Sequence, residues 1–488
     1  LFERISYLSS TQVDDFGIPS LISRMTTDTY NVHNMLGMMQ RIGIRAPILV
    51  IGGIFVTSTL DLYLTLVLVA ILPMLGFLVY FVTKRSLPLY KEQQSSVDRL
   101  IRKVRENIVG IRVIKALSKT DYEIEQFKDV NLDVVKKEKR AGMTTAVINP
   151  SMSLLLNLGL VCIIVVGAFR VNMGLTEVGK IIAFLTYFTI ILNAMMAVTR
   201  VFVVLSRASA SANRIKEVLD TEKDLVKQDI DVTNNSHVNS STGKSDYHIE
   251  FNNVSFSYNS VENNLSNINF KLKRGESLGI IGSTGSGKTT IINLLMRFYD
   301  VNTGEILIDG QNIKSMDKFA LNEKFGIVFQ NDTIFEDTIL ENITLGRKIN
   351  LEQVKEASVY AQASDFIENI DGNYDAKLDI RGANLSGGQK QRILIARALA
   401  GRPEILILDD SSSALDYKTD ANLRKEVRDN FKETTTIIVA QRVSSIMSSD
   451  HILVLEDGEI IGYGTHEDLI NTCDIYKEIS NSQMSENS

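Results

Sequence analysis

Four long stretches without charged side chains dominate the first 200 residues. They contain no Asp, Glu, Lys or Arg over lengths of 15, 22, 29 and 19 residues, at 46–60, 62–83, 141–169 and 181–199. A helix needs about 20 largely apolar residues to cross a bilayer, and the first stretch reaches this length if Arg41 and Arg45 extend to the interface. A buried soluble core produces one such stretch, whereas four indicate a membrane domain. The pattern therefore predicts an α-helical bundle over 1–220, with spans near 40–60, 62–83, 150–170 and 178–200.

The segment between the second and third spans, Lys84–Arg140, carries 15 basic and 9 acidic residues. The positive-inside rule places it in the cytosol, and four spans then put both ends of the chain there too. Apolar residues recur in this segment at helical spacing, which predicts membrane helices that extend over 84–140 and turn near Lys119–Phe127. Ser9–Asp28 has a similar character. A solvated helical hairpin without further contacts is the alternative.

The composition changes after a helix predicted to end near Asp220. Thr233–Asp246 is rich in Asn and Ser and lacks periodicity, so 221–247 is interpreted as a linker. Over 248–488, short β-like runs alternate with helical patterns, which is typical of an α/β domain. The 488 residues exceed one ordinary domain, and a net charge of −6 gives no general case for a nucleic-acid partner.

A glycine-rich motif lies early in the α/β region. Gly282–Thr289 has the sequence GSTGSGKT, between an apolar run at Ser277–Ile281 and a helical run at Thr290–Phe298. In this context glycines let backbone N–H groups converge on phosphate oxygens at a helix N-terminus, Lys288 reaches the β- and γ-phosphates, and the Thr289 hydroxyl binds Mg²⁺. The predicted nucleotide-binding residues here are Gly282, Ser283, Thr284, Gly285, Ser286, Gly287, Lys288, Thr289 and Thr290.

Two further motifs carry phosphate chemistry. The apolar run Ile405–Leu408 ends in two carboxylates, of which Asp409 is predicted to be the magnesium ligand. A second anion site at a helix N-terminus is predicted from the sequence LSGGQ, residues Leu385, Ser386, Gly387, Gly388 and Gln389. One domain has no obvious need for two phosphate sites on separate helices. A dimer needs both sites if each nucleotide binds the phosphate loop of one subunit and the LSGGQ segment of the other.

In combination, these motifs resemble those of the ATP-binding cassette (ABC) proteins, and membrane helices ahead of the cassette on one chain resemble the ABC exporters. The resemblance covers essentially the whole chain. It implies an α-helical transmembrane bundle of the exporter type followed by an α/β P-loop cassette with a helical subdomain, in the plasma membrane. Exporter halves have six spans, so the chain is expected to be a fragment without the first two. Ser9–Asp28 and Lys119–Phe127 match the family's cytosolic coupling helices.

The resemblance also implies roles for single residues. Tyr258 is expected to stack on adenine, with a surface tyrosine as the alternative. Gln330 is expected to touch Mg²⁺ or the attacking water, and Asp416 to lie at the dimer seam. The implied ligands are ATP and Mg²⁺, and the implied partners are a second exporter half, the lipid bilayer and an exported small or lipophilic substrate.

Two positions depart from the family pattern. The family usually has Glu after the magnesium-binding Asp, as general base on the attacking water, and a His after the strand Thr436–Val439; this chain has Asp410 and Gln441. An aspartate withdraws its carboxylate by about 1.5 Å, one C–C bond, and a glutamine does not ionise near neutral pH. The predicted catalytic residues are Asp410, Gln441 and Gln330. Because both changes fall in one site, we predict that this nucleotide site binds ATP but hydrolyses it slowly.

The intact LSGGQ then favours a heterodimer whose partner supplies Glu and His. Hydrolysis would occur mainly at the site that the partner's residues catalyse. One alternative is a regulatory subunit, in which ATP bound here sets dimer closure without turning over. A homodimer with two feeble sites is the other alternative, and it leaves no efficient catalytic site.

Overall fold

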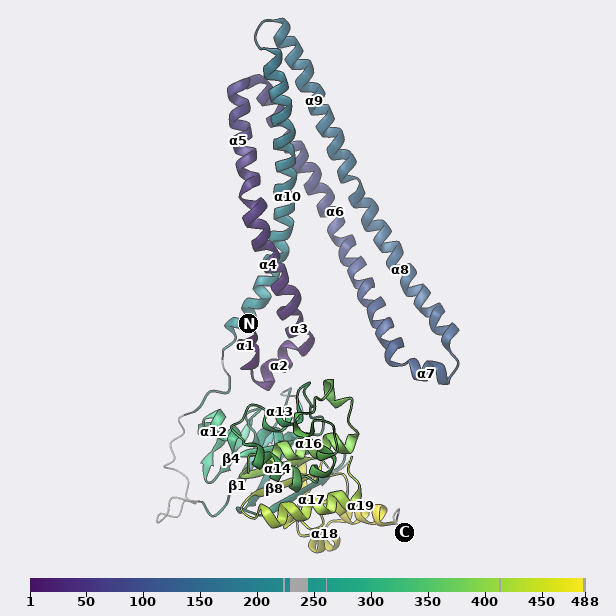
Figure 1. Ribbon diagram of the computed structural model, residues 1–488, viewed down its shortest axis with the longest axis vertical. Helices are drawn as coiled ribbons and strands as arrows, with labels where there is room; N and C mark the ends of the chain where they lie inside the picture. The colour runs from purple at the N-terminus through teal and green to yellow at the C-terminus, as the bar shows by residue number, and fades with distance from the viewer. Residues whose placement is uncertain (223, 229–244, 260, 412–413, 486–488) are drawn as a thin grey trace. The chain divides into compact units, whose positions relative to one another are not determined.

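The computed structural model describes residues 1–485 other than 223, 229–244, 260 and 412–413. The chain forms two compact units (Figure 1). The first comprises residues 1–6 and 18–221, and the second comprises 7–17 and 222–488. Most of the predicted linker, 229–244, lies outside the described residues.

The first unit is entirely helical. Its elements are α1 (Phe2–Ser6), α3 (Ile18–Ser23), the π-helical η1 (Arg24–Asp28), α4 (Thr29–Met38), the π-helical η2 (Met39–Gly43), α5 (Arg45–Leu60), α6 (Leu62–Val109), α7 (Ile111–Ala116), α8 (Thr120–Ala146), α9 (Ile148–Asn172) and α10 (Val178–Asp220). Four stretches are long and apolar enough to cross a membrane: Ile18–Leu60, Leu62–Val109, Thr120–Asn172 and Val178–Val198. Each contains one predicted span, except that the fourth stretch ends two residues before residue 200.

Close packing of small and large side chains holds the bundle together. Phe184 and Phe188 of α10 are fully buried against the apolar faces of α6 and α9. A Cβ atom at Gly159 would come within 2.6 Å of both Ile71 and Phe188, so glycine lets these helices approach. Near the start of α6, the buried Asp61 caps the helix through Tyr63 N and pairs with Arg170 Nε at 3.0 Å. This ion pair ties the α5–α6 turn to α9.

The helical hairpin of α6 and α8 is turned by α7, earlier than the predicted turn at Lys119–Phe127. Gly110 ends α6, and Ser118, with a φ of 54°, separates α7 from α8. Lys119–Phe127 continues as the start of α8 because its residues keep a helical pattern. Along the hairpin, Asp133 of α8 accepts hydrogen bonds from Ser96 and Arg99 of α6 at 2.8 and 2.7 Å.

Two sheets and a helical subdomain make up the second unit (Figure 1). One sheet has the order β2-β1-β4-β5 and is antiparallel; the other has the order β10-β9-β3-β8-β7-β6 and is parallel except for β10. The strands are β1 (Ile249–Phe256), β2 (Leu265–Leu272), β3 (Ser277–Gly282), β4 (Thr303–Ile308), β5 (Gln311–Asn312), β6 (Phe325–Val328), β7 (Ile405–Asp409), β8 (Thr435–Val439), β9 (His451–Glu456) and β10 (Glu459–Gly464).

Helices surround these strands. The α-helices are α2 (Ser10–Phe16), α11 (Lys288–Leu295), α12 (Lys318–Glu323), α13 (Ile339–Thr344), α14 (Leu351–Tyr360), α15 (Ser364–Glu368), α16 (Gly387–Leu399), α17 (Tyr417–Asn430), α18 (His466–Thr472) and α19 (Asp474–Ser485). Short 3-10 turns lie at η4 (Ile313–Ser315), η5 (Asn373–Asp375), η6 (Ile380–Gly382) and η7 (Val443–Ser445). The helices α13–α16 form the helical subdomain around their own apolar core.

The central strands β3 and β7 are buried on both faces, as their uninterrupted apolar sequences require. Because β3, β7 and β8 run parallel, their carboxyl ends meet at one edge of the sheet. In open α/β sheets, ligands bind at this edge.

The helix α2 belongs to the same unit as the cassette. Ser9 caps it and also donates to Asp224 Oδ2 at 2.5 Å, and Gln12 Nε2 donates to the Glu222 carbonyl at 2.6 Å. Near its other end, Tyr299 donates its phenolic proton to Asp14 Oδ2 at 2.6 Å. The predicted connector at Ser9–Asp28 is therefore not one continuous helix. Its first helix, α2, ends at Gly17, which has a φ of 74°.

Candidate functional site

The phosphate loop lies between β3 and α11. Gly285 and Gly287 have φ values of 88° and 100°, which favour glycine, and a Cβ atom at Gly282 would come within 2.1 Å of the Leu455 carbonyl. Lys288 begins α11 and folds back across the loop, where its Nζ donates to the carbonyls of Gly282 and Ser283 at 2.9 and 2.7 Å. Burial lowers the pKa of Lys288, while Asp409 and Asp410 act in the opposite direction.

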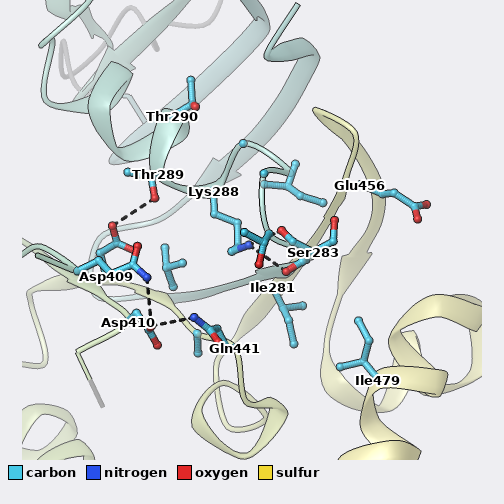
Figure 2. Close-up of a pocket in the computed structure, with 18 of the residues that line it drawn as sticks. Ile281, Ser283, Lys288, Thr289, Thr290, Asp409, Asp410, Gln441, Glu456 and Ile479 are labelled. Atoms are coloured by element: carbon cyan, nitrogen blue, oxygen red, sulfur yellow. Dashed lines mark hydrogen bonds between the residues drawn. The ribbon is translucent and has the colours of Figure 1, made fainter. Parts of the chain in front are cut away.

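A cavity of about 710 Å³ opens beside this loop (Figure 2). The structure brings most of the predicted site residues together around it: Gly282, Ser283, Thr284, Gly285, Gly287, Lys288, Thr289, Thr290, Gln330, Asp409, Asp410 and Gln441. Ser286 does not line it. Its side chain is buried, and its hydroxyl has no hydrogen-bond partner among the residues that the structure describes.

Asp409 ends β7 at the floor of the cavity. Its Oδ2 accepts from the Thr289 hydroxyl at 3.5 Å, and its side chain is buried. Burial and the adjacent Asp410 raise the pKa of Asp409, against the effects of Thr289 and Lys288. Thr289, Asp409 and Gln330 all line the cavity, and their side-chain oxygens are the hard ligands that Mg²⁺ prefers, so this donor set fits Mg²⁺.

Asp410 follows in a left-handed backbone conformation, with a φ of 51°. The side-chain amide of Gln441 donates to Asp410 Oδ2 at 2.9 Å, and that of Gln330 donates to the same oxygen at 3.5 Å (Figure 2). Burial raises the pKa of Asp410, whereas the Gln330 amide, Lys288, Arg442 and the Gln441 amide act to lower it. Both positions that depart from the family pattern thus contact each other directly.

Tyr258 is 45% exposed and lies next to α11, outside the cavity lining. Its hydroxyl accepts from Asn293 Nδ2 at 3.2 Å and lies 3.4 Å from Thr290 Oγ1. Its ring packs edge-to-face on Phe256 and Tyr299, with centroids 4.8 and 5.0 Å apart. These contacts hold the ring beside α11, and its contact with adenine stays a prediction.

The LSGGQ segment lies in the helical subdomain and contributes no lining residue to the cavity. Ser386 caps α16: its hydroxyl accepts from Gln389 N at 3.3 Å, and its own N–H donates to Gln389 Oε1 at 2.9 Å. The first N–H groups of α16 belong to Gly387 and Gly388, so no side chain shields them. The structure thus separates this segment from the phosphate loop of the same chain.

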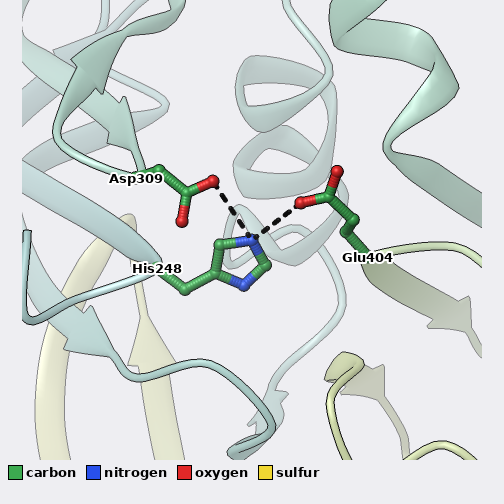
Figure 3. Close-up of side chains that lie close together, drawn as sticks. All are labelled: His248, Asp309 and Glu404. Carbon is green, nitrogen blue, oxygen red and sulfur yellow. Dashed lines mark ion pairs between the residues drawn. The ribbon is translucent and has the colours of Figure 1, made fainter. Parts of the chain in front are cut away.

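His248 belongs to a second cluster of ionisable residues, with Asp309 and Glu404 (Figure 3), near the amino ends of β7 and β8. Its buried Nε2 lies 4.0 Å from Asp309 Oδ2 and 3.8 Å from Glu404 Oε2, and the three groups fall within the reach of one metal ion. However, Arg274 pairs with both carboxylates at 2.9 and 3.1 Å, and Lys324 pairs with Glu404 at 2.9 Å. Because the two negative charges are already balanced, we assign the cluster a structural role.

Eight residues that line the cavity are not among the site residues predicted from the sequence: Asn264, Ile281, Val439, Ala440, Leu455, Glu456, Ile475 and Ile479. Ile475 and Ile479 lie four residues apart on α19, a spacing that indicates an apolar helix face but names no ligand. Asn264 and Glu456 belong to no recognisable sequence motif. Only the folded structure brings them to the phosphate loop.

Comparisons with known proteins agree with this architecture. Residues 1–195 match the ABC transporter transmembrane region and residues 265–413 match the ABC transporter family. The uncharacterized ABC transporter ATP-binding protein YfiB of Bacillus subtilis (strain 168) is 35% identical over 486 residues, covering 99% of this chain and 83% of that protein. Rv1273c of Mycobacterium tuberculosis (strain ATCC 25618 / H37Rv), also an uncharacterized ABC transporter ATP-binding protein, is 34% identical over 488 residues, with coverages of 99% and 82%.

A solved structure of a bacterial Atm1-family ABC exporter with ATP bound superposes with a TM-score of 0.83 at 25% identity, covering 99% of this chain and 83% of that one. The predicted fold class is confirmed: a helical transmembrane region precedes an α/β nucleotide-binding cassette. Several apolar helices joined to an ATP-binding cassette are consistent with a multi-pass protein of the plasma membrane. The chain belongs to the ABC transporter family, as an exporter half in which the membrane domain is fused to its transport ATPase cassette.

Proposed function

We propose that this chain is one half of a heterodimeric ABC exporter of a small or lipophilic substrate, and that its own nucleotide site binds ATP but hydrolyses it slowly. ATP, with Mg²⁺ held by Thr289, Asp409 and Gln330, closes the two cassettes. The chain's LSGGQ segment then completes the partner's site, where most hydrolysis takes place. Tyr258 provides the surface for adenine.

The hydrogen bond from Gln441 to Asp410 carries this proposal. A general base must reach the attacking water, and Asp410 is shorter by one methylene, about 1.5 Å, than the glutamate that the family usually has. The amides of Gln441 and Gln330 also donate to Asp410 Oδ2, at 2.9 and 3.5 Å. These two hydrogen bonds occupy Oδ2, so that oxygen is less available to accept a proton from the attacking water. Both effects slow water activation without disturbing the phosphate loop.

The capped N-terminus of α16 supports the second half of the proposal. Ser386 and Gln389 form a complete capping box, which orients the free N–H groups of Gly387 and Gly388. These groups are suited to a phosphate anion, and no cavity-lining atom of the chain's own site comes from them. An intact signature segment on a chain whose own site has a shortened general base supports two nucleotide sites that differ within the dimer.

The decisive experiment is ATPase activity of the full-length protein in proteoliposomes, alone and with the exporter half encoded beside it. We expect negligible turnover alone and robust turnover together. Replacing the partner's catalytic Glu by Gln should then lower turnover by about 10²–10⁴-fold, the usual contribution of a general base. Asp410→Asn in this chain should have a much smaller effect.

Photolabelling with an azido-ATP distinguishes the slow site from a regulatory subunit. Nucleotide bound to this chain should convert to ADP slowly but measurably over many turnovers of the dimer. ATP that never converts would identify the regulatory subunit instead. Fast turnover by the wild-type chain alone would rule out both, and would show that Asp410 and Gln441 are compatible with efficient hydrolysis.

A further inference from the structure

The helix α19, at the end of the described chain, is bound to the loop that carries Gln441. The Gln483 side chain donates from Nε2 to the Gln441 carbonyl at 2.9 Å. Its Oε1 accepts from the Val443 N–H at 2.8 Å. One side-chain amide thus forms a pair of hydrogen bonds with the backbone of residues 441 and 443, as a neighbouring β-strand would.

The rest of α19 packs firmly enough to hold this amide in place. Tyr476 is fully buried in a cluster with Ala440, Val443 and Ile446, so the helix and the loop share one apolar core. On the adjacent face, Ile475 and Ile479 line the nucleotide cavity, and Figure 2 shows Ile479 on its helix at the side of the site. The helix therefore contacts both the nucleotide cavity and the loop.

The loop places the Gln441 side chain against Asp410. Val439 accepts from the Asp410 N–H at 2.9 Å, and Gln441 Nε2 donates to Asp410 Oδ2 at 2.9 Å. Ala440 and Val443 are buried residues, whereas Gln441 and Arg442 between them are exposed. The pair of hydrogen bonds from Gln483 spans this exposed turn, where Arg442 also lies 5.4 Å from the centre of the Tyr417 ring.

We propose that Gln483 is a positioning residue: through α19 it holds the 441–443 loop so that the Gln441 amide stays on Asp410. The inference deepens the proposed function and rests on it, because it assigns the control of the same slow site to the C-terminal helix. Loss of the Gln483 amide leaves two backbone groups to water and lets the loop take other positions. The contact between Gln441 and Asp410 is then made for a smaller fraction of the time.

The test uses the full-length protein, assembled with its partner half in lipid nanodiscs. The variant Gln483→Ala removes both hydrogen bonds. Gln483→Glu keeps an acceptor for the Val443 N–H and loses the donor to the Gln441 carbonyl. Asn481→Ala is the matched control, since Asn481 is exposed on the same helix. Hydrogen exchange of the peptide containing Val443 reports loop position, and nucleotide Kd and single-turnover hydrolysis on this chain report the site.

For Gln483→Ala we expect exchange at Val443 to accelerate about tenfold, the factor for loss of a hydrogen bond of typical net strength. Single-turnover hydrolysis on this chain should change at least threefold in rate while the Kd for ATP changes less than twofold. Gln483→Glu should keep the slow exchange at Val443 and still alter hydrolysis, whereas Asn481→Ala should leave all three readouts unchanged.

Unchanged exchange in Gln483→Ala would overturn the inference, and so would faster exchange with an unaltered rate of hydrolysis. If the proposed function is wrong, the experiment gives a different result. If the wild-type site hydrolyses ATP rapidly, the slow-site assignment falls, while the exchange result still decides whether Gln483 holds the loop.

Discussion

At the carboxyl ends of β3 and β7, Lys288, Asp409 and Asp410 face an open cavity of about 710 Å³. At the amino ends of β7 and β8, His248 and Glu404 lie among charges that pair with one another. The two edges of one sheet thus carry the same kinds of residue. At the first edge, charges face space that a nucleotide can fill; at the second, Arg274 and Lys324 neutralise Asp309 and Glu404.

This difference distinguishes a ligand-binding site from a structural charge network within one domain. Open, incompletely balanced charges are suited to bind a charged ligand, because the ligand completes their interactions. A balanced network joins elements instead: the His248 cluster connects β1, the β4–β5 turn and the starts of β7 and β8. Changes at the two edges should therefore have opposite consequences for ATP binding and for stability.

The largest expected effect is on ATP binding. Lys288→Ala should weaken ATP binding to this chain by about 30- to 100-fold, since charge-assisted hydrogen bonds to phosphate are lost. The melting temperature of the nucleotide-free protein should change little. Lys324→Ala, at the other edge, is the matched control and should lower the melting temperature while the Kd for ATP stays the same. Equal effects of both variants on Kd would break the comparison.

A smaller effect is expected on the pH dependence of folding stability. Burial, followed by the charge of Arg274, lowers the pKa of His248 to about 4, against the effects of Asp309 and Glu404. The unfolded chain binds this proton near pH 6.5 and the folded one does not, so stability falls as pH drops below 6.5 and levels off below 4. Between pH 7.5 and 5.0 the loss amounts to about 2 kcal/mol.

Urea unfolding of the detergent-solubilised protein at several pH values, followed by cassette fluorescence, measures this slope. His248→Asn should flatten the slope by that amount, since the Asn does not titrate. Nucleotide affinity should show no matching pH step. A variant with an unchanged slope would mean that another group titrates in this range.

The smallest effect is expected where the nucleotide edge meets α2. Tyr299→Phe keeps the ring against Tyr258, 5.0 Å between centroids, and removes the hydrogen bond to Asp14. Because this bond is exposed, its loss should change dimer ATPase activity only about two- to fivefold, with little change in Kd. Asp14→Asn combined with Tyr299→Phe should add no further loss. Additive effects of the two variants would show that they act separately.

The sequence predicted much of the nucleotide edge because its chemistry is local. Gly282–Thr289 and the strand before Asp409 follow patterns set by the backbone and by phosphate binding, so the residues could be named before the fold was known. Apolar stretches likewise predicted the membrane helices. The helical spacing over 84–140 predicted that these helices extend beyond the apolar stretches, and α6 runs for 48 residues through Pro73 and Pro88, prolines of a kind that membrane helices tolerate.

The remaining features depend on contacts between residues distant in sequence. His248 meets Glu404 and Thr435 only after two sheets form, and Gln483 meets Val443 only when α19 packs on the cassette. The turn at α7 was misplaced by about ten residues, because Lys119–Phe127 has a helical pattern whether it lies in a turn or begins a helix. Local periodicity identifies a helix but not its neighbours.

The contact between Asp410 and Gln441 also bears on how this site changes over evolutionary time. Aspartate and glutamate codons differ at the third base, and so do glutamine and histidine codons. Each family residue is therefore one mutation away. Yet a side chain one methylene longer at 410 would alter the contact with the Gln441 amide, whose nitrogen lies 2.9 Å from Asp410 Oδ2. An exchange at either position also changes this contact, so we expect the two positions to change together although each codon is one base from that of the family residue.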